Sequence, residues 1–281
     1  MRSAAPPIHS RVSRPEHQPD GVPGPATHNA DHVMLQGPHS RWRELWLVLQ
    51  TARDFLHAFR ALHFVGPCVT VFGSARFGEH HPYYRLGRTV GQRLGAMGFT
   101  VMTGGGPGLM EAANRGAKDA GGTSVGCNIH LPREQQPNRF LDRWVTCEHF
   151  FVRKVVLFKY SYAFVALPGG IGTVDELFEA LTLIQNRKVA RFPVVMIGES
   201  YWRPLRRFLG QMQEAGAITA ADLELFLITD DLDLAMDHLE RHAIDRFRLR
   251  QQRRPRPVAW LGERARKPVS TLTHPSLNGA R

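Results

Sequence analysis

The sequence predicts an α/β fold with a doubly wound, mostly parallel sheet that is covered by helices on both faces. Three observations support this class. Short β-branched runs alternate with longer segments of helical periodicity, the strand-like runs are continuously apolar, and glycine-bearing turns follow three of them. Continuously apolar strands are typical of parallel sheets buried on both faces. In such sheets ligands bind beyond the carboxyl ends of the strands, so any site is expected at those turns.

The hydrophobic pattern places the elements along the chain. A helix is expected after Ser40, which can serve as its N-cap, because Trp42, Leu45 and Trp46 begin an apolar stripe at helical spacing. This helix is expected to pack on the domain or on a second subunit. Strands are expected at 69–72, 99–102, 123–128, 144–146, 163–167 and 194–197. Further helices are expected at 82–97, 108–120, 149–160, 173–187 and 200–215.

These elements divide the chain into four parts. Residues 1–39 are rich in Pro, His, Ser and Gly without periodicity, so a disordered leader is expected there. Residues 40–63 are expected to form an accessory amphipathic helix, and 64–240 a Rossmann-like domain that contains the glycine-bearing turns. A basic tail spans 241–281.

The basic tail accounts for most of the formal net charge of +11. The segment from Arg241 to Arg281 contains eleven Arg and Lys residues, and its only acidic residues are Asp245 and Glu263. A solvated tail explains this run, and contact with nucleic acid or an acidic partner is the alternative. Because the rest of the chain is close to neutral, nucleic acid is not the expected partner.

Other bulk features argue against several protein classes. No apolar stretch approaches the roughly 20 residues that span a bilayer, and no secretory signal opens the chain, so a cytoplasmic protein without membrane contact is expected. The three cysteines, Cys68, Cys127 and Cys147, are widely spaced and predicted to be reduced core residues. The 14 histidines show no ligand spacing, so no metal site is expected.

Two glycine-bearing turns follow the first and second strands. In Phe72-Gly73-Ser74-Ala75-Arg76, Ser74 and Arg76 could hydrogen-bond a polar ligand, although an ordinary turn explains this run equally well. In 103–111, the run Gly104-Gly105-Gly106-Pro107-Gly108 precedes a helix whose N-terminus can hold phosphate. A dinucleotide site is disfavoured, because Leu109 stands where a third small residue belongs and no ribose-binding acid follows at the usual spacing. Tight strand-to-helix packing is the structural alternative.

The third turn is Pro168-Gly169-Gly170-Ile171-Gly172-Thr173, which leads into Glu176. It has the parts of an anion cradle but lacks the lysine of a nucleoside triphosphate-binding loop. A capping box between Thr173 and Glu176 is the structural alternative. Upstream, Arg153 and Lys154 would lie near this loop if their helix packs beside it.

Taken together, the run Gly104–Gly116, the pair Arg153-Lys154 and the run from Pro168 to Glu176 resemble the Lonely Guy family. These are cytokinin riboside 5′-monophosphate phosphoribohydrolases, often mislabelled lysine decarboxylases, and the bacterial long-chain branch is most similar. The resemblance covers about residues 66–215. It implies hydrolysis of the N-glycosidic bond of an adenosine 5′-monophosphate-type nucleotide, AMP or a cytokinin riboside 5′-monophosphate, with no cofactor and in a homodimer or larger homo-oligomer.

The resemblance also assigns roles to residues. Arg153 and Glu176 match the catalytic pair. Substrate contacts are expected from the turns and their neighbours: Ser74, Gly105, Gly106, Glu134, Lys154, Pro168, Gly169, Gly170, Gly172 and Thr173. The residue types suit this chemistry, because a carboxylate stabilises the positive charge that develops on the ribose. A guanidinium can stabilise the departing base and the phosphate.

Two other classes stay open from the sequence. A non-catalytic nucleotide sensor or carrier could use the same fold, with nucleic-acid contact through the tail. An amino-acid decarboxylase would need a lysine in a recognisable pyridoxal phosphate loop. None of the lysines has that setting: Lys118, Lys154, Lys159, Lys188 and Lys267.

Overall fold

A computed structural model describes residues 30–130, 136–189, 192–245, 247 and 249. Its centre is a seven-stranded sheet with the order β4-β3-β2-β1-β5-β6-β7, in which every neighbouring pair is parallel. The strands are β1 Cys68–Phe72, β2 Thr100–Thr103, β3 Ser124–Ile129, β4 Arg143–Cys147, β5 Ser161–Ala166, β6 Val194–Ile197 and β7 Phe226–Thr229. The predicted doubly wound α/β class is confirmed.

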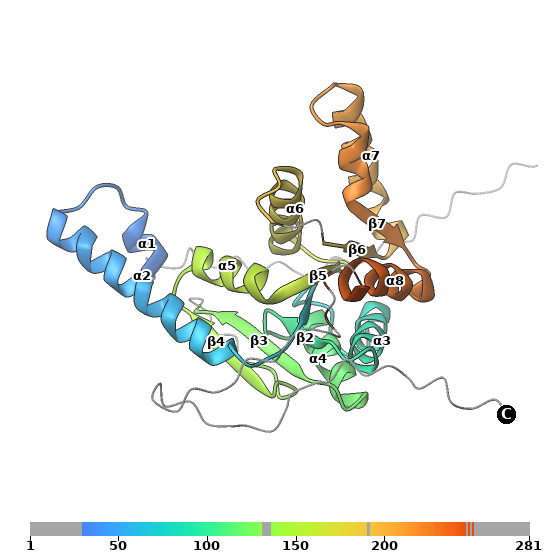
Figure 1. Ribbon diagram of the computed structural model, residues 1–281, viewed down its shortest axis with the longest axis horizontal. Helices are drawn as coiled ribbons and strands as arrows, with labels where there is room; N and C mark the ends of the chain where they lie inside the picture. The colour runs from blue at the N-terminus through green and yellow to red at the C-terminus, as the bar shows by residue number, and fades with distance from the viewer. Residues whose placement is uncertain (1–29, 131–135, 190–191, 246, 248, 250–281) are drawn as a thin grey trace, which may run out of the picture.

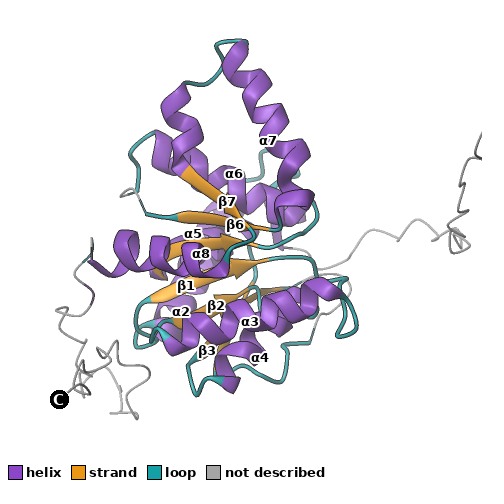
Figure 2. Cartoon of the chain, turned by 90° about the vertical axis from the view of Figure 1, so that its right-hand side faces the viewer, coloured by secondary structure: helices purple, strands orange, loops and turns teal. Residues whose placement is uncertain are grey.

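Helices cover both faces of this sheet (Figures 1 and 2). They are α1 Ala30–Met34, α2 Arg41–Leu62, α3 Pro82–Ala96, α4 Leu109–Asp119, α5 Phe150–Tyr160, α6 Ile171–Gln185, α7 Glu199–Glu214 and α8 Leu232–Leu239. One apolar cluster joins the sheet to α2, α5 and α6, and a second joins the opposite face to α3, α4 and α8. Two buried faces explain why the strands read as continuous apolar runs.

Each predicted strand and helix between residues 69 and 215 is present, with its ends shifted by at most two residues. The elements after α7 were not predicted: the 3₁₀ helix η1 Ala220–Leu225, β7, α8 and the π-helix η2 Glu240–Asp245. β7 is an edge strand of only four residues, Phe226-Leu227-Ile228-Thr229, and it lies between the short helices η1 and α8, so its apolar run is too short to identify a strand by itself.

The expectation of disorder across 1–39 is wrong for 30–34, where α1 forms. This short helix is held by tertiary contacts, because the Asp31 carboxylate bonds to His149 and Phe150 far along the chain. Residues 1–29 and most of the basic tail lie outside the described residues.

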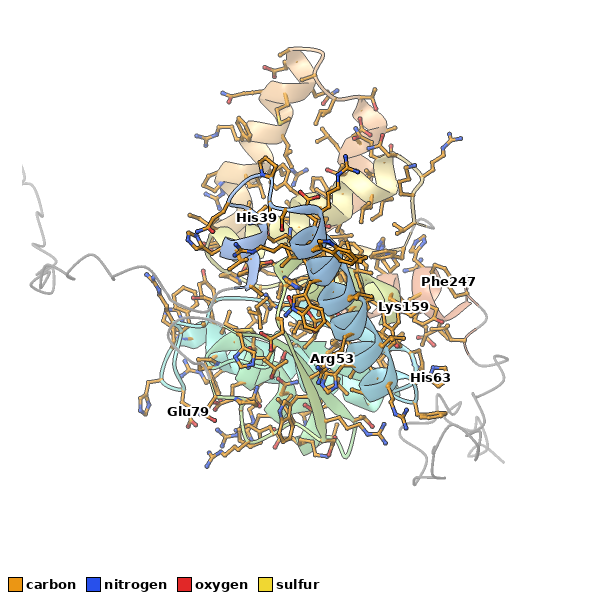
Figure 3. All side chains as sticks on the ribbon, turned by 90° about the vertical axis from the view of Figure 1, so that its left-hand side faces the viewer. His39, Arg53, His63, Glu79, Lys159 and Phe247 are labelled. Atoms are coloured by element: carbon orange, nitrogen blue, oxygen red, sulfur yellow. The ribbon has the colours of Figure 1, made fainter. Side chains whose placement is uncertain are left out.

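α2 is the predicted accessory helix and lies along β4 and α5 at one edge of the molecule (Figure 1). It buries Leu47, Asp54, Ala58 and Leu62. Near its end the Lys159 ammonium of α5 lies 4.8 Å from the centre of the Phe59 ring (Figure 3). Large apolar side chains on its other face are exposed, Trp42 to 83%. Packing of this helix on a second subunit, in a homo-oligomer, stays a prediction. Among the described residues, no helix is both long and apolar enough to cross a membrane.

α3 and α4 approach so closely that glycine is required at their contact. A Cβ atom on Gly91 would lie 2.0 Å from the Ala113 carbonyl oxygen, and one on Gly116 would lie 1.9 Å from that of Arg88. Because both obstructing atoms belong to backbone, neither can move aside cheaply. This contact fixes α4, and with it the glycine turn from which α4 begins.

The connections reverse direction at the middle of the sheet. From β1 the chain winds through β2 and β3 to β4 at one edge, and then crosses back to place β5 on the other side of β1. Such a reversal leaves a crevice at the carboxyl ends of the strands on either side of it. The β1/β5 junction is therefore where this fold offers a ligand site.

Candidate active site

A cavity of about 510 Å³ opens at this end of the sheet. Its walls come from the turn after β1, from the ends of β2 and β3, and from the first turns of α4, α5 and α6. The lining residues are Phe72, Gly73, Ser74, Ala75, Arg76, Gly104, Met110, Asn128, Ile129, Phe150, Arg153, Gly170, Ile171, Gly172, Thr173 and Glu176. The structure thus brings together Ser74, Arg153, Gly170, Gly172, Thr173 and Glu176, all predicted from the sequence.

The first turn of α6 presents backbone N–H groups to the cavity. α6 begins at Ile171 with Gly170 as N-cap and no side-chain cap. The N–H groups of Ile171 and Gly172 precede the first intrahelical hydrogen bonds, so they remain available to an anion. Added Cβ atoms on Gly170 and Gly172 would meet nothing within 4 Å, so an anion could approach both backbones.

The capping-box alternative for Thr173 and Glu176 is wrong. Both residues lie inside α6, past its N-cap, and no side chain caps this helix. The Thr173 side chain instead packs against Gly169, where a Cβ atom would lie 2.1 Å from its Oγ1. Helix capping therefore does not explain why a glutamate stands at position 176.

Glu176 is a buried carboxyl group facing the cavity. Its side chain is 4% exposed, and within the described residues its Oε2 atom has no hydrogen-bond partner. Burial raises the pKa of Glu176 to about 7, while the nearby charges of Arg153 and Lys154 oppose that shift. A buried carboxyl oxygen without a hydrogen-bond partner is costly, and together with the raised pKa it marks this position as a functional candidate.

Arg153 reaches the same cavity from α5. Its Nε–H donates to the Cys127 carbonyl at the end of β3, 3.0 Å away. That bond leaves the other guanidinium N–H groups for a ligand. The guanidinium also lies against Gly104, where a Cβ atom would come within 2.5 Å of Nη2.

A Gly104→Ala substitution is expected to displace the Arg153 guanidinium. The two groups that the new methyl meets are the flexible ends of Arg153 and Met110, so the free energy of unfolding should fall by less than about 1 kcal/mol. Because the family resemblance assigns Arg153 to the catalytic pair, hydrolysis of AMP should fall at least tenfold, since a small misplacement of such a group is costly. Urea unfolding and kcat/KM measure the two effects. Gly78→Ala, where a methyl meets nothing, is the control, and equal activity in both variants would contradict the assignment.

Lys154, Gly105 and Gly106, which were also predicted as site residues, are not among the residues that line the cavity. Lys154 forms ion pairs with Asp175 at 2.8 Å and Glu179 at 2.9 Å. The Gly105 and Gly106 carbonyls accept hydrogen bonds from the buried Asn138 amide at 3.2 and 3.1 Å. These residues hold the neighbouring loops and helices, and their contact with substrate stays a prediction.

Hydrogen bonds also fix the carbonyl groups of Pro168 and Gly169. The Pro168 carbonyl accepts from the Ser74 N–H at 3.1 Å, and the Gly169 carbonyl accepts from the Tyr201 hydroxyl at 2.6 Å. These bonds tie the turn before α6 to the turn after β1 and to α7. Glu134, the remaining predicted contact, lies outside the described residues.

The cavity includes residues that the motifs did not single out as site residues. Asn128 and Ile129 end β3, Met110 lies in α4, and Phe150 begins α5. Arg76, which the sequence offered with Ser74 as a possible ligand contact, also lines the wall. The signal that could have found Asn128 is its position at a strand end, next to the other turns. No group of three or more His, Cys, Asp or Glu side chains in the described ranges could hold a metal ion.

Comparison with known proteins agrees with this geometry. A family model described as "Possible lysine decarboxylase" matches residues 110–239. A protein of Mycobacterium marinum named cytokinin riboside 5′-monophosphate phosphoribohydrolase is 30% identical over 159 residues, which cover 56% of this chain and 85% of that protein. The chain belongs to the Lonely Guy family. A Rhodococcoides fascians protein of the same name is 29% identical over 175 residues, covering 60% of this chain and 86% of that protein.

Solved structures similar to this Lonely Guy family chain include the molybdenum cofactor carrier protein of Chlamydomonas reinhardtii. It is 23% identical, covers 63% of this chain and 97% of its own, and has a TM-score of 0.49. A likeness this distant carries no argument about function.

Proposed function

We propose that the cavity hydrolyses the N-glycosidic bond of adenosine 5′-monophosphate-type nucleotides, AMP or a cytokinin riboside 5′-monophosphate, and releases free base and ribose 5-phosphate. The observation that carries the proposal is the buried Glu176 carboxyl, which lines the cavity with Arg153 and whose Oε2 atom has no hydrogen-bond partner among the described residues. The relatives named cytokinin riboside 5′-monophosphate phosphoribohydrolase support the same reaction.

The 5′-phosphate is assigned to the N-terminus of α6. Free N–H groups and the helix dipole favour a dianion there, and Gly170 and Gly172 leave room for it. Thr173, which also lines the cavity, offers a hydroxyl nearby. Ser74 closes the opposite side from the turn after β1. With the phosphate held there, the ribose lies within reach of Glu176, one turn further along α6.

Glu176 and Arg153 then divide the chemistry. As the bond between C1′ and the base nitrogen breaks, positive charge builds on the ribose and the base gains electron density. The Glu176 carboxylate stabilises the ribose and orients a water, whose oxygen bonds to C1′ while its proton passes to the departing base. The Arg153 guanidinium stabilises the anionic groups of the departing base and phosphate.

A decarboxylase function has less support. Pyridoxal phosphate enzymes hold their cofactor through a lysine, and no lysine of the described residues lines the cavity. Lys154 follows the cavity residue Arg153 in the sequence, but its ammonium group forms ion pairs with Asp175 and Glu179. A non-catalytic nucleotide sensor or carrier is the competing proposal, because the same cavity could bind a nucleotide without cleaving it.

The experiment that separates catalysis from binding is incubation of the purified protein with AMP, GMP, CMP and N6-isopentenyl-AMP, followed by chromatography for free base. Release of adenine or its N6-substituted form is expected, and Arg153→Ala serves as the impaired reference. Nucleotide binding without any base release would favour the sensor or carrier.

The rate should depend on the ionisation of Glu176. Because the carboxylate form is the one that stabilises the ribose, kcat/KM should rise about tenfold per pH unit below a pKa of about 7 and level off above it. A profile of kcat/KM against pH measures this rise, since its midpoint reports the pKa of the group in the free enzyme. Activity that instead falls as pH rises through 7 would mean that Glu176 acts as an acid, contrary to the proposed role.

A further inference from the structure

α5, the helix that carries Arg153, begins without a cap of its own. The side chain of its N-cap residue, His149, makes no capping hydrogen bond, and its first turn contains no acidic residue. The first N–H groups of a helix need acceptors, which Ser, Thr, Asp or Asn at the N-cap usually supply. For α5, the acceptors come from elsewhere in the chain.

Two carboxylates from the N-terminal helices bind the N–H groups of the first residue of α5 and of the two residues before it. Asp54 of α2 accepts through Oδ2 from the N–H groups of Glu148 at 3.0 Å and His149 at 3.2 Å. Asp31 of α1 accepts from the Phe150 N–H at 3.0 Å, and its other oxygen lies 3.1 Å from His149 Nδ1. Asp54 and His149 are buried, so these bonds are shielded from water. The consecutive peptides 148–150 are thus held from outside α5.

The electrostatics of α5 give these carboxylates a second effect. Arg153 and Lys154 lie close to the helix N-terminus, where the helix dipole disfavours positive charge. The negative charges of Asp31 and Asp54 offset that penalty at the same helix end. Lys154 has its own partners in Asp175 and Glu179.

Arg153 is directly coupled to the held peptides. Its backbone N–H donates to the His149 carbonyl at 3.1 Å, and its side chain is fixed by the Cys127 carbonyl at 3.0 Å. A shift of the α5 N-terminus would therefore move the guanidinium against β3. Figure 1 shows α1 and α2 together beside the start of α5.

We propose that Asp31 and Asp54 are positioning residues that set the place of the Arg153 guanidinium in the cavity. Both residues lie outside 110–239, the part that the family model matches, so α1 and α2 supply a function to the catalytic domain. The effect on turnover rests on the proposed function of Arg153, whereas the effect on the position of its guanidinium does not.

The kinetic test is a double-mutant cycle. Asp31→Ala and Asp54→Ala are each made alone and together with Arg153→Ala, and Asp54→Asn is added as a milder variant that keeps an acceptor oxygen. Each alanine variant should lower kcat/KM about tenfold, the scale of a lost hydrogen bond to a charged group. In the Arg153→Ala background the same changes should have almost no effect. Equal losses in both backgrounds would overturn the proposal.

The matched control is Asp231→Ala. Asp231 caps α8 by accepting from the N–H groups of Asp233 at 2.8 Å and Leu234 at 3.1 Å, so its loss removes a comparable cap away from the cavity. It should lower stability while kcat/KM stays unchanged. A tenfold loss in this control would show that removal of any helix cap is sufficient, and the proposal would fail.

A second readout needs no turnover. The Nε–H signal of Arg153, assigned by its disappearance in Arg153→Ala, reports the hydrogen bond to Cys127 in nuclear magnetic resonance spectra of the free protein. It should shift in Asp31→Ala and Asp54→Asn and remain in place in Asp231→Ala. An unchanged signal in the first two overturns the positioning role, even if the wild type proves active. A shifted signal supports it, even if the wild type releases no base.

Discussion

Glu176→Gln is expected to lower kcat/KM for the proposed nucleotide by about 10²–10³. The loss follows from the charge, because Gln keeps the size of Glu but cannot offer a carboxylate to the positive ribose, and removing one preorganised electrostatic group costs on this scale. Release of free base from AMP, measured by chromatography at pH 8, is the assay. A variant as active as the wild type would exclude Glu176 from catalysis.

The same substitution is expected to stabilise the protein. The pKa of Glu176 is raised from 4.5 to about 7 by burial, so the folded state binds its proton more tightly than the unfolded state. Wild-type stability therefore falls as pH rises from about 4.5 to 7 and stays lower above that. Gln does not ionise, so its advantage should be absent below pH 4.5 and reach at most about 3 kcal/mol at pH 8.

Urea unfolding at pH 4.5 and pH 8 tests this dependence. The control is Glu179→Gln on the same helix, which removes a carboxylate that is paired with Lys154 and should stabilise the protein at neither pH. If Glu176→Gln gave the same change in stability at both pH values, the buried carboxyl would not titrate as inferred. A gain in stability together with a loss of activity is the signature of a group kept for function.

Gly91→Ala is expected to lower the free energy of unfolding by more than about 3 kcal/mol. An alanine normally favours a helix over glycine by about 1 kcal/mol. Here, however, the methyl would lie 2.0 Å from the Ala113 carbonyl oxygen of α4, so the two helices must separate. Overpacking of this kind against backbone lies at the severe end of core substitutions.

Gly210→Ala is the matched control for this prediction. Gly210 also lies inside a helix, α7, but an added Cβ atom there meets nothing within 4 Å. It should raise stability by up to about 1 kcal/mol. Denaturant unfolding of both variants gives the comparison, and a Gly91→Ala protein as stable as the wild type would mean that the α3–α4 contact tolerates separation.

The sequence was sufficient for the parallel sheet because its strands are buried on both faces and its helices are long. The elements after α7 escaped prediction, since η1, β7, α8 and η2 are only four to eight residues long and short runs carry little periodicity. α1 escaped because its five residues have no periodicity of their own and are held by Asp31 against a distant helix end. Contacts of this kind depend on pairs more than a hundred residues apart, which local patterns do not encode.

Part of the candidate site could likewise be predicted from the sequence, and part could not. Arg153, Glu176 and the glycines of the α6 turn belong to recognisable motifs, and the structure places them around one cavity. The local pattern of Thr173-Val174-Asp175-Glu176 could not distinguish a helix-capping box from the wall of a ligand site, because both use the same residue types. The start of α6 at Ile171 decided between them. Asn128 and Phe150 were missed because neither belongs to a recognisable motif, although Asn128 lies at a strand end and Phe150 begins the helix that carries Arg153.

The reversal at the middle of the sheet also constrains when the site can form during synthesis. β1 is made early, yet its neighbour β5 follows more than ninety residues later, as the pairing of Val69 with Ala163 shows. Non-local pairing of this kind slows folding. Until β5 is in place, β1 has one edge unpaired and the α6 turn has no strand to extend from. The nascent chain can therefore complete its cavity only after Glu176 has left the ribosome, and an N-terminal fragment ending at β4 would lack the cavity walls that α5 and α6 contribute.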